Sequence, residues 1–131
     1  MSALLAPPTG ELARRILASV SYTDRILAGR LTPRLGIMRG SVRGLPELHL
    51  YLTPDDSTLP AINLERLADW IEQVIADVDL AREVRSTAAA AGSYVDACMA
   101  MHPLVGSRLA QAREVIGADS GADPGTTAPR A

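Results

Sequence analysis

The sequence predicts an α+β domain in which an N-terminal helix or helix pair precedes a short antiparallel β-hairpin and a helical C-terminal half. Three patterns support this fold class. Apolar residues recur at helical spacing near both ends of the chain and at period two between residues 34 and 53, and glycine and proline separate these regions. The length of 131 residues suits a single domain.

The first helical region follows a short lead. Residues 1–8 include two prolines, and we expect them to be flexible, ahead of one domain over residues 9–117. Thr9 can cap a helix whose apolar positions recur at spacing four: Leu12, Ile16 and Val20. The pattern weakens at residues 19–23 and resumes until Pro33, which predicts either one helix with a weak joint or two short helices.

The next region changes its period. Leucine and isoleucine alternate with other residues in two short runs, at about 34–39 and 47–53. Gly40, Gly44 and Pro46 fall between the runs, so we expect two antiparallel strands joined by a glycine-containing turn. A two-stranded sheet is marginal by itself, so helices must cover its apolar face or another subunit must extend its edge.

The clearest element is an amphipathic helix after the loop at residues 54–60. Asn63 can cap it, and apolar residues then follow the i, i+3, i+4, i+7 template, which predicts a helix to about Gly92. Four positions are expected to form the centre of the core: Leu67, Ile71, Val74 and Val78.

Two further helices are predicted in the C-terminal part. Ser93 can cap the first, which Pro103 is expected to kink or end. The second covers Leu104 to Ile116, and Gly117 is a suitable stop. Residues 118–131 are rich in Gly, Ala, Thr, Asp and Pro, and we expect a disordered tail.

Charge is unevenly distributed along the chain. All 13 basic residues are arginine, and the net charge is -2. Residues 1–45 carry seven arginines and two acids, a net +5, whereas residues 46–131 carry six arginines and thirteen acids, a net -7. Opposite charges at the two ends favour docking of one part onto another, within a chain or between chains.

Composition also bears on source and location. Lysine and phenylalanine are absent and alanine is abundant, which favours codons rich in G and C and predicts a high-GC bacterium or phage as the source. A single cysteine, the lack of a secretory signal and the lack of a long apolar stretch predict a soluble cytoplasmic protein without a membrane partner.

Two sets of charged residues are candidate contact sites. Arg34, Arg39 and Arg43 alternate with glycines, a combination that suits phosphate groups but also an ordinary hairpin. The acids Glu65, Asp69 and Glu72 form a stripe on one face of the long predicted helix. We expect the arginines to dock onto this acidic stripe in a neighbouring subunit, because the segment lacks the aromatic residues that stack on bases.

The sequence supplies little reactive chemistry. Cys98 and His102 share a helix face, but two ligands are too few for a closed metal site, so core packing is expected. His49 is expected to face solvent from a strand. The common nucleotide, hydrolase and zinc-protease motifs are absent, so we predict no catalytic residue, no metal and no cofactor.

These observations rank three functions. The first is a non-enzymatic interaction or assembly protein, self-associating or a subunit of a larger complex. The alternative is a module that binds nucleic-acid backbones through the arginine- and glycine-rich hairpin. The third is a small-molecule enzyme whose site assembles from residues without a visible motif.

Overall fold

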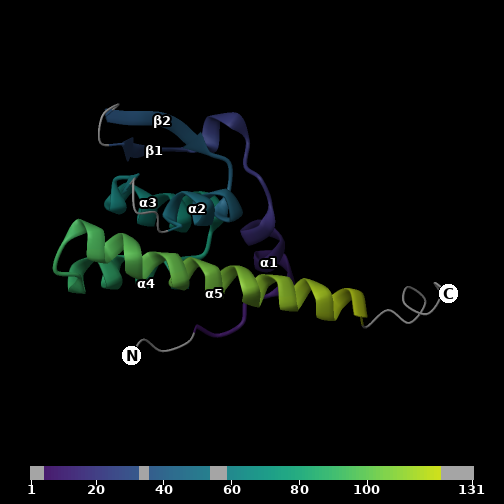
Figure 1. Cartoon of the computed structure of the whole chain (residues 1–131). Coiled ribbons are helices and arrows are strands. Elements are labelled where there is room, and N and C mark those ends of the chain that lie inside the picture. The colour runs from purple at the N-terminus through teal and green to yellow at the C-terminus, as the bar shows by residue number, and fades with distance from the viewer. Residues whose placement is uncertain (1–4, 33–35, 54–58, 122–131) are drawn as a thin grey trace.

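The computed structural model of the chain describes residues 5–32, 36–53 and 59–121. Its elements form three layers, a small sheet, a middle helical layer and a pair of long helices, with one more helix beside them (Figure 1). The sheet contains β1 (Ile26–Thr32), β2 (Gly36–Val42) and β3 (Leu59–Ala61). The helices are α1 (Gly10–Leu17) at the side, α2 (Leu45–Leu52) and α3 (Leu64–Trp70) in the middle, and α4 (Val78–Ala90) and α5 (Tyr94–Gly121) in the outer layer. This architecture confirms the predicted α+β fold class.

Helix α1 begins as predicted but is short. The hydroxyl of Thr9 accepts a hydrogen bond from the backbone N–H of Leu12 at 3.2 Å, and Ala13 and Ile16 are buried. The predicted continuation of this helix is wrong, because Ile26–Thr32 forms strand β1 after a 3-10 turn at Tyr22–Asp24. Within β1, Ile26 and Ala28 are buried and Leu27 between them is exposed, so period two describes this segment better than helical spacing does.

The predicted hairpin exists but lies earlier in the chain. β1 pairs antiparallel with β2 over their whole lengths, and β3 adds to the other side of β1, so the strand order is β2-β1-β3. Only the first predicted strand, at about 34–39, overlaps a real one. Strand β2 begins at Gly36, whose φ of +76° is a conformation that glycine adopts without strain.

The second predicted strand, at 47–53, is wrong because this segment is helix α2. Leucine at every second position fits a strand, but Leu48 and Leu52 are also one helical turn apart, and both are buried. The leucine between them, Leu50, is 65% exposed. Pro46 stands in the first turn, where its missing N–H costs nothing.

The long predicted helix is interrupted in its middle. Asn63 caps α3 as expected, accepting a hydrogen bond from the N–H of Arg66 at 3.0 Å. A π-helical turn at Ile71–Ile75 follows, the chain turns at residues 76 and 77, and α4 begins at Val78. Leu67 and Ile71 are buried core residues as predicted, but Val74 is only half-buried and Val78 is 53% exposed, because the break changes the phase of the helix.

The two predicted C-terminal helices are one. Ser93 accepts a hydrogen bond from the N–H of Asp96, and α5 then runs for 28 residues through both Pro103 and Gly117. Pro103 removes one backbone donor, but the buried stripe continues across it from Met101 to Val105, so packing keeps the helix together. The first four residues of the predicted tail are therefore helical, and residues 122–131 lie outside the described part of the chain.

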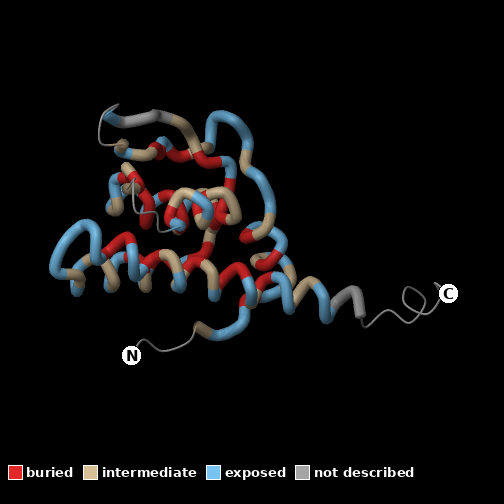
Figure 2. The backbone as a smooth tube through the Cα atoms, in the orientation of Figure 1, coloured by how far each residue is buried: buried red, intermediate tan, exposed pale blue. Residues whose placement is uncertain are grey.

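Buried residues line the spaces between the layers (Figure 2). The middle layer contributes Leu45, Leu48, Leu67 and Ile71, and α5 contributes Met101, Val105 and Leu109 from below. Within the described residues, no helix is both long and apolar enough to cross a membrane. The core thus lies on one face of the sheet, which leaves the opposite sheet face without a helix over it (Figure 1).

Candidate functional site

The predicted arginine cluster is divided by the fold. Arg34 lies outside the described residues, and Arg39 stands in the middle of β2, opposite Gly29 of β1. Arg43 follows β2 and pairs with Glu47 in the first turn of α2, with 3.2 Å between Nη2 and Oε2. The backbone N–H of Arg43 also donates to Glu47 at 2.7 Å, and this hydrogen bond lowers the pKa of that carboxyl. Arg43 thus stabilises the start of α2.

The glycines beside these arginines have packing roles. A Cβ on Gly40 would lie 2.8 Å from the hydroxyl oxygen of Tyr51, which sits under the sheet on α2. A Cβ on Gly44 would lie 2.5 Å from the carbonyl oxygen of Ala18, just after α1. Close approach of neighbouring elements therefore accounts for both glycines.

The predicted acidic stripe is partly neutralised within the chain. Arg85 of α4 contacts Asp69 at 2.9 Å and Glu72 at 2.7 Å. Glu65 is exposed in the first turn of α3, away from these two ion pairs. Because Asp69 and Glu72 already have a cation, they offer less attraction to arginines of another subunit.

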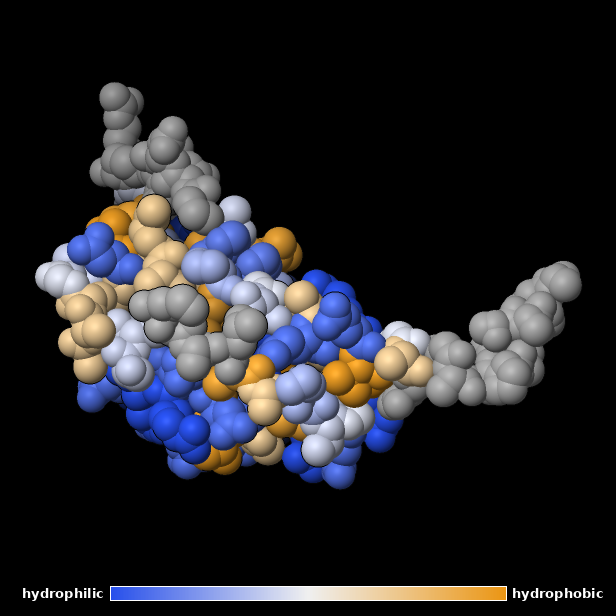
Figure 3. All heavy atoms as spheres, turned by 90° about the horizontal axis from the view of Figure 1, so that it is seen from below, coloured by the Kyte–Doolittle hydropathy of each residue, from blue (hydrophilic) through white to orange (hydrophobic). Residues whose placement is uncertain are grey.

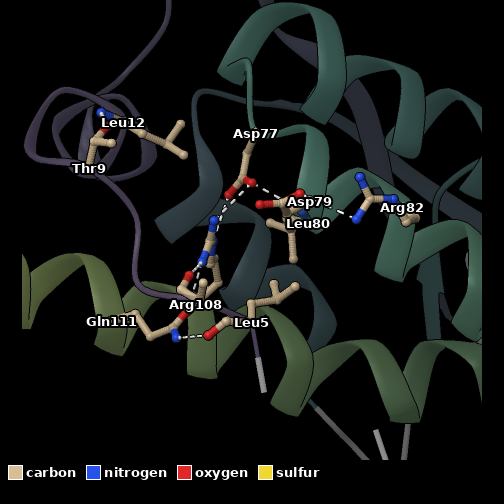
Figure 4. A network of polar contacts seen from close by, with 10 residues as sticks. Leu5, Thr9, Leu12, Asp77, Asp79, Leu80, Arg82, Arg108 and Gln111 are labelled. Atoms are coloured by element: carbon tan, nitrogen blue, oxygen red, sulfur yellow. Dashed lines mark hydrogen bonds and ion pairs between the residues drawn. The ribbon is translucent and has the colours of Figure 1, made fainter. Parts of the chain in front are cut away.

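A buried polar network lies between α4, α5 and the N-terminal arm, residues 5–8 (Figure 4). The guanidinium of Arg108 binds both carboxylate oxygens of Asp77, with Nε to Oδ2 at 2.7 Å and Nη2 to Oδ1 at 3.1 Å. Both side chains are at most 1% exposed. Asp77 also accepts a hydrogen bond from the N–H of Leu80, so one residue caps α4 and holds the buried arginine.

The same network holds the N-terminal arm against α5. Nη1 of Arg108 donates to the carbonyl of Ala6 at 2.7 Å and to the side chain of Gln111 at 2.9 Å. Gln111 in turn donates to the carbonyl of Leu5. This network could not be predicted from the sequence, because its members come from distant segments and Asp77 lies inside the pattern of a continuous helix.

Beside this network, a groove of about 850 Å³ runs between α4 and α5. Small residues from both helices line it together with Leu5 of the N-terminal arm, Gln111 beside the arm, and carboxylates from both helices. Seen from below, this side of the molecule shows hydrophilic residues around smaller hydrophobic patches (Figure 3).

The two histidines of the chain are in contact, which the sequence did not suggest. His49 lies on α2, and not on a solvent-facing strand, and its ring stacks on that of His102 of α5, with 4.3 Å between centroids and 13° between planes. Burial, the neighbouring His102 and Arg113 lower the pKa of His49. Parallel stacked rings do not converge on a common ligand, and the described residues contain no group of three metal-ligating side chains.

Cys98 and Tyr94 contribute to packing and to the attachment of α5. Cys98 is buried, as expected for a core residue, and burial raises the pKa of its thiol. The hydroxyl of Tyr94 accepts from the N–H of Ile62 at 3.0 Å and donates to the carbonyl of Pro60 at 2.5 Å, which fixes the start of α5 to β3. Burial raises the pKa of Tyr94 to about 12.

The open face of the sheet is the most unusual surface. Residues directly opposite in paired strands share a face, so Leu27 and Leu31 of β1 lie on the same side as Leu59 of β3. Leu27 is 74% exposed and Leu31 is 43% exposed, although both stand in the central strand. We call Leu27, Leu31, Leu59 and the adjoining edge of β2 the open sheet surface. Comparisons with protein-family models, curated proteins and solved structures gave no match to this chain.

Proposed function

We propose that this chain is a non-enzymatic assembly protein that self-associates through the open sheet surface. The observation that carries this proposal is the exposure of Leu27 and Leu31 in the central strand of the sheet, on the side away from the helices. The solvated face of an antiparallel sheet normally carries polar side chains, so two exposed leucines on it are unusual. A second copy of the same surface would remove these side chains from water and so stabilise the pair.

The edge of β2 supports the same proposal. Among the described residues β2 pairs only with β1, so it is an edge strand of the sheet. Proteins usually protect such an edge with charged side chains, proline or a bulge; Gly36–Val42 has one charged residue, Arg39, contains no proline and pairs with β1 without a bulge.

Nucleic-acid binding has less support. Arg43 is held by Glu47, and Gly40 and Gly44 have packing reasons in the fold. No aromatic platform accompanies Arg39 among the described residues of the hairpin. This alternative therefore enters only as an outcome of the test.

The test is the molar mass in solution, measured by light scattering during size-exclusion chromatography. We expect the parent chain to show a multiple of 13.8 kDa and the double variant Leu27→Arg, Leu31→Arg to show one chain. Leu50→Arg is the control, because the exposure of Leu50 lies between those of Leu27 and Leu31 but Leu50 is on α2. Its mass should equal that of the parent.

A parent that stays monomeric at high micromolar concentration would overturn the proposal. If that monomer also binds a DNA or RNA oligonucleotide in a salt-dependent way, the result favours the nucleic-acid alternative.

A further inference from the structure

We infer that the groove between α4 and α5 is a docking site for a basic amphipathic helix of another protein. The groove is lined mainly by residues of α4 and α5. These helices form the outer layer, on the side of the molecule away from the sheet (Figure 1). This second interface is therefore independent of self-association and can be tested separately.

The floor of the groove suits a helix. Seven small residues from α4, its C-terminal end and α5 line it: Ser86, Thr87, Ala90, Ala91, Ala100, Ser107 and Ala110. Small residues let helix backbones approach closely, so a third helix can lie along the pair as in a helical bundle. Leu104 and Leu5 add larger apolar contacts. An occupant with alanine and leucine on one face would fit this floor.

The rim of the groove is acidic. Glu83 comes from α4, and Asp96 and Glu114 come from α5. None of these carboxylates forms an ion pair with a described residue. Arg108 also lines the groove, but it is 1% exposed and its charge is matched by Asp77. The rim therefore attracts cations from a partner.

The carboxylates of the rim accept hydrogen bonds. They fit a partner that brings donors, which arginine side chains supply.

The distances along α5 set the size of the occupant. Asp96 and Glu114 are 18 residues apart on one helix, which corresponds to about 27 Å at 1.5 Å per residue. A partner helix of about 18 residues with arginines near both ends can reach both carboxylates.

The probe is a fluorescein-labelled synthetic peptide of about 18 residues, with alanine and leucine on one helical face and arginine on both flanks. Binding is measured by fluorescence anisotropy at low salt. We expect micromolar affinity, and no binding of a control peptide in which every arginine is replaced by glutamate.

Two variants test the site. The triple variant Glu83→Gln, Asp96→Asn, Glu114→Gln should weaken binding by about tenfold, since each rim pair contributes modestly. Ala100→Trp should also weaken binding by at least about tenfold, because the indole fills the floor while the acids remain. Each variant has a control outside the groove. The control for the triple variant is Glu11→Gln, Glu65→Gln, Asp79→Asn, and the control for Ala100→Trp is Ala89→Trp on α4.

Circular dichroism before binding confirms that each variant is folded. Absence of peptide binding by the parent would overturn the inference. So would equal weakening by both triple neutralisations, or unchanged binding by Ala100→Trp, since either result indicates unspecific attraction to an acidic protein. The variant Leu27→Arg, Leu31→Arg should bind the peptide as the parent does, so failure of one interface is distinguished from failure of the other.

Discussion

Ala76 adopts an unusual backbone conformation for its residue type. It ends the π-helical turn with φ 68° and ψ 31°, the left-handed region, in which a Cβ is crowded by the neighbouring carbonyl oxygen. It is the only residue other than glycine with a positive φ in the described part of the chain. This turn allows Asp77 to cap α4 and to reach Arg108, so local strain is offset by the buried ion pair.

Glycine at this position should stabilise the protein. We expect Ala76→Gly to raise the free energy of unfolding by about 1 kcal/mol, because glycine has no Cβ to strain. Urea denaturation measures this difference. Ala110→Gly, in the interior of α5, is the control and should lower stability by about 1 kcal/mol. The same sign for both substitutions would contradict the assignment of strain to Ala76.

The buried ion pair should be far more costly to break than to replace. We expect Arg108→Met to lower the free energy of unfolding by about 3 to 5 kcal/mol, because Asp77 would remain buried without a cation. The double variant Asp77→Asn, Arg108→Met should recover part of this loss, since no charge is then buried and Asn can still cap α4. Chemical denaturation of the three proteins checks the order. A double variant less stable than Arg108→Met would contradict it.

At the scale of elements, the contact of α2 with α5 depends on protonation. His49 of α2 stacks on His102 of α5, and its pKa is lowered by burial and by the neighbouring His102 and Arg113. His102 also lies 3.5 Å from the hydroxyl of Thr53. The contact is therefore most stable when His49 is uncharged.

Stability should fall with acid through this contact. Because the pKa of His49 is lowered from 6.5 in the folded state, the unfolded chain takes up this proton first as the pH drops. The contribution of His49 is then present above about pH 6.5 and is lost progressively below it. We expect the thermal midpoint to fall less between about pH 7 and 5 in His49→Phe, which keeps a ring but cannot be protonated. An identical pH dependence in both proteins would exclude a role for His49.

Helices with a regular apolar pattern and a capping residue could be predicted from the sequence. Thr9, Asn63 and Ser93 cap helices as expected, and the core positions Leu67 and Ile71 are correct. Leucines at every second position in α2 could not be assigned, because such leucines also fall one helical turn apart. The interruption after Ile75 was hidden because Val78 continues the helical template while lying in the next helix.

The candidate sites could be predicted only in part. The sequence indicated that the hairpin would have an uncovered edge, and β2 is an edge strand. The contacts of His49 with His102 and of Asp77 with Arg108 could not be predicted, because these pairs form between segments whose distance in space depends on the whole fold. Ion pairs such as Arg85 with Asp69 and Glu72 likewise depend on the angle between α3 and α4.

At the scale of the whole molecule, two different surfaces lie in different layers. The exposed leucines of the open sheet surface belong to the sheet layer, whereas the acidic groove is lined by α4 and α5, which form the outer helical layer (Figure 1). The middle layer separates them with buried leucines and isoleucines. Binding at one surface therefore leaves the other accessible, and one chain can join copies of itself to a different partner.

Salt should distinguish the two surfaces. Between about 0.01 M and 1 M salt the Debye length falls from about 30 Å to 3 Å, which screens the rim of the groove. We expect peptide binding to weaken strongly over this range while the mass of the assembled protein stays constant or rises. Light scattering and anisotropy on the same samples measure both. Dissociation of the assembly at high salt would indicate that charge pairs, and not the leucines, hold it together.

The attachment of the N-terminal arm to α5 has a consequence for the order of events during synthesis. The carbonyl of Ala6 meets a donor 102 positions later in the chain, on Arg108. At about 5 to 20 residues per second, the ribosome makes that donor roughly 5 to 20 seconds after the acceptor. The hairpin of β1 and β2 can form within microseconds of its emergence. The N-terminal arm can therefore attach to α5 only late in folding, after Arg108 has left the ribosome.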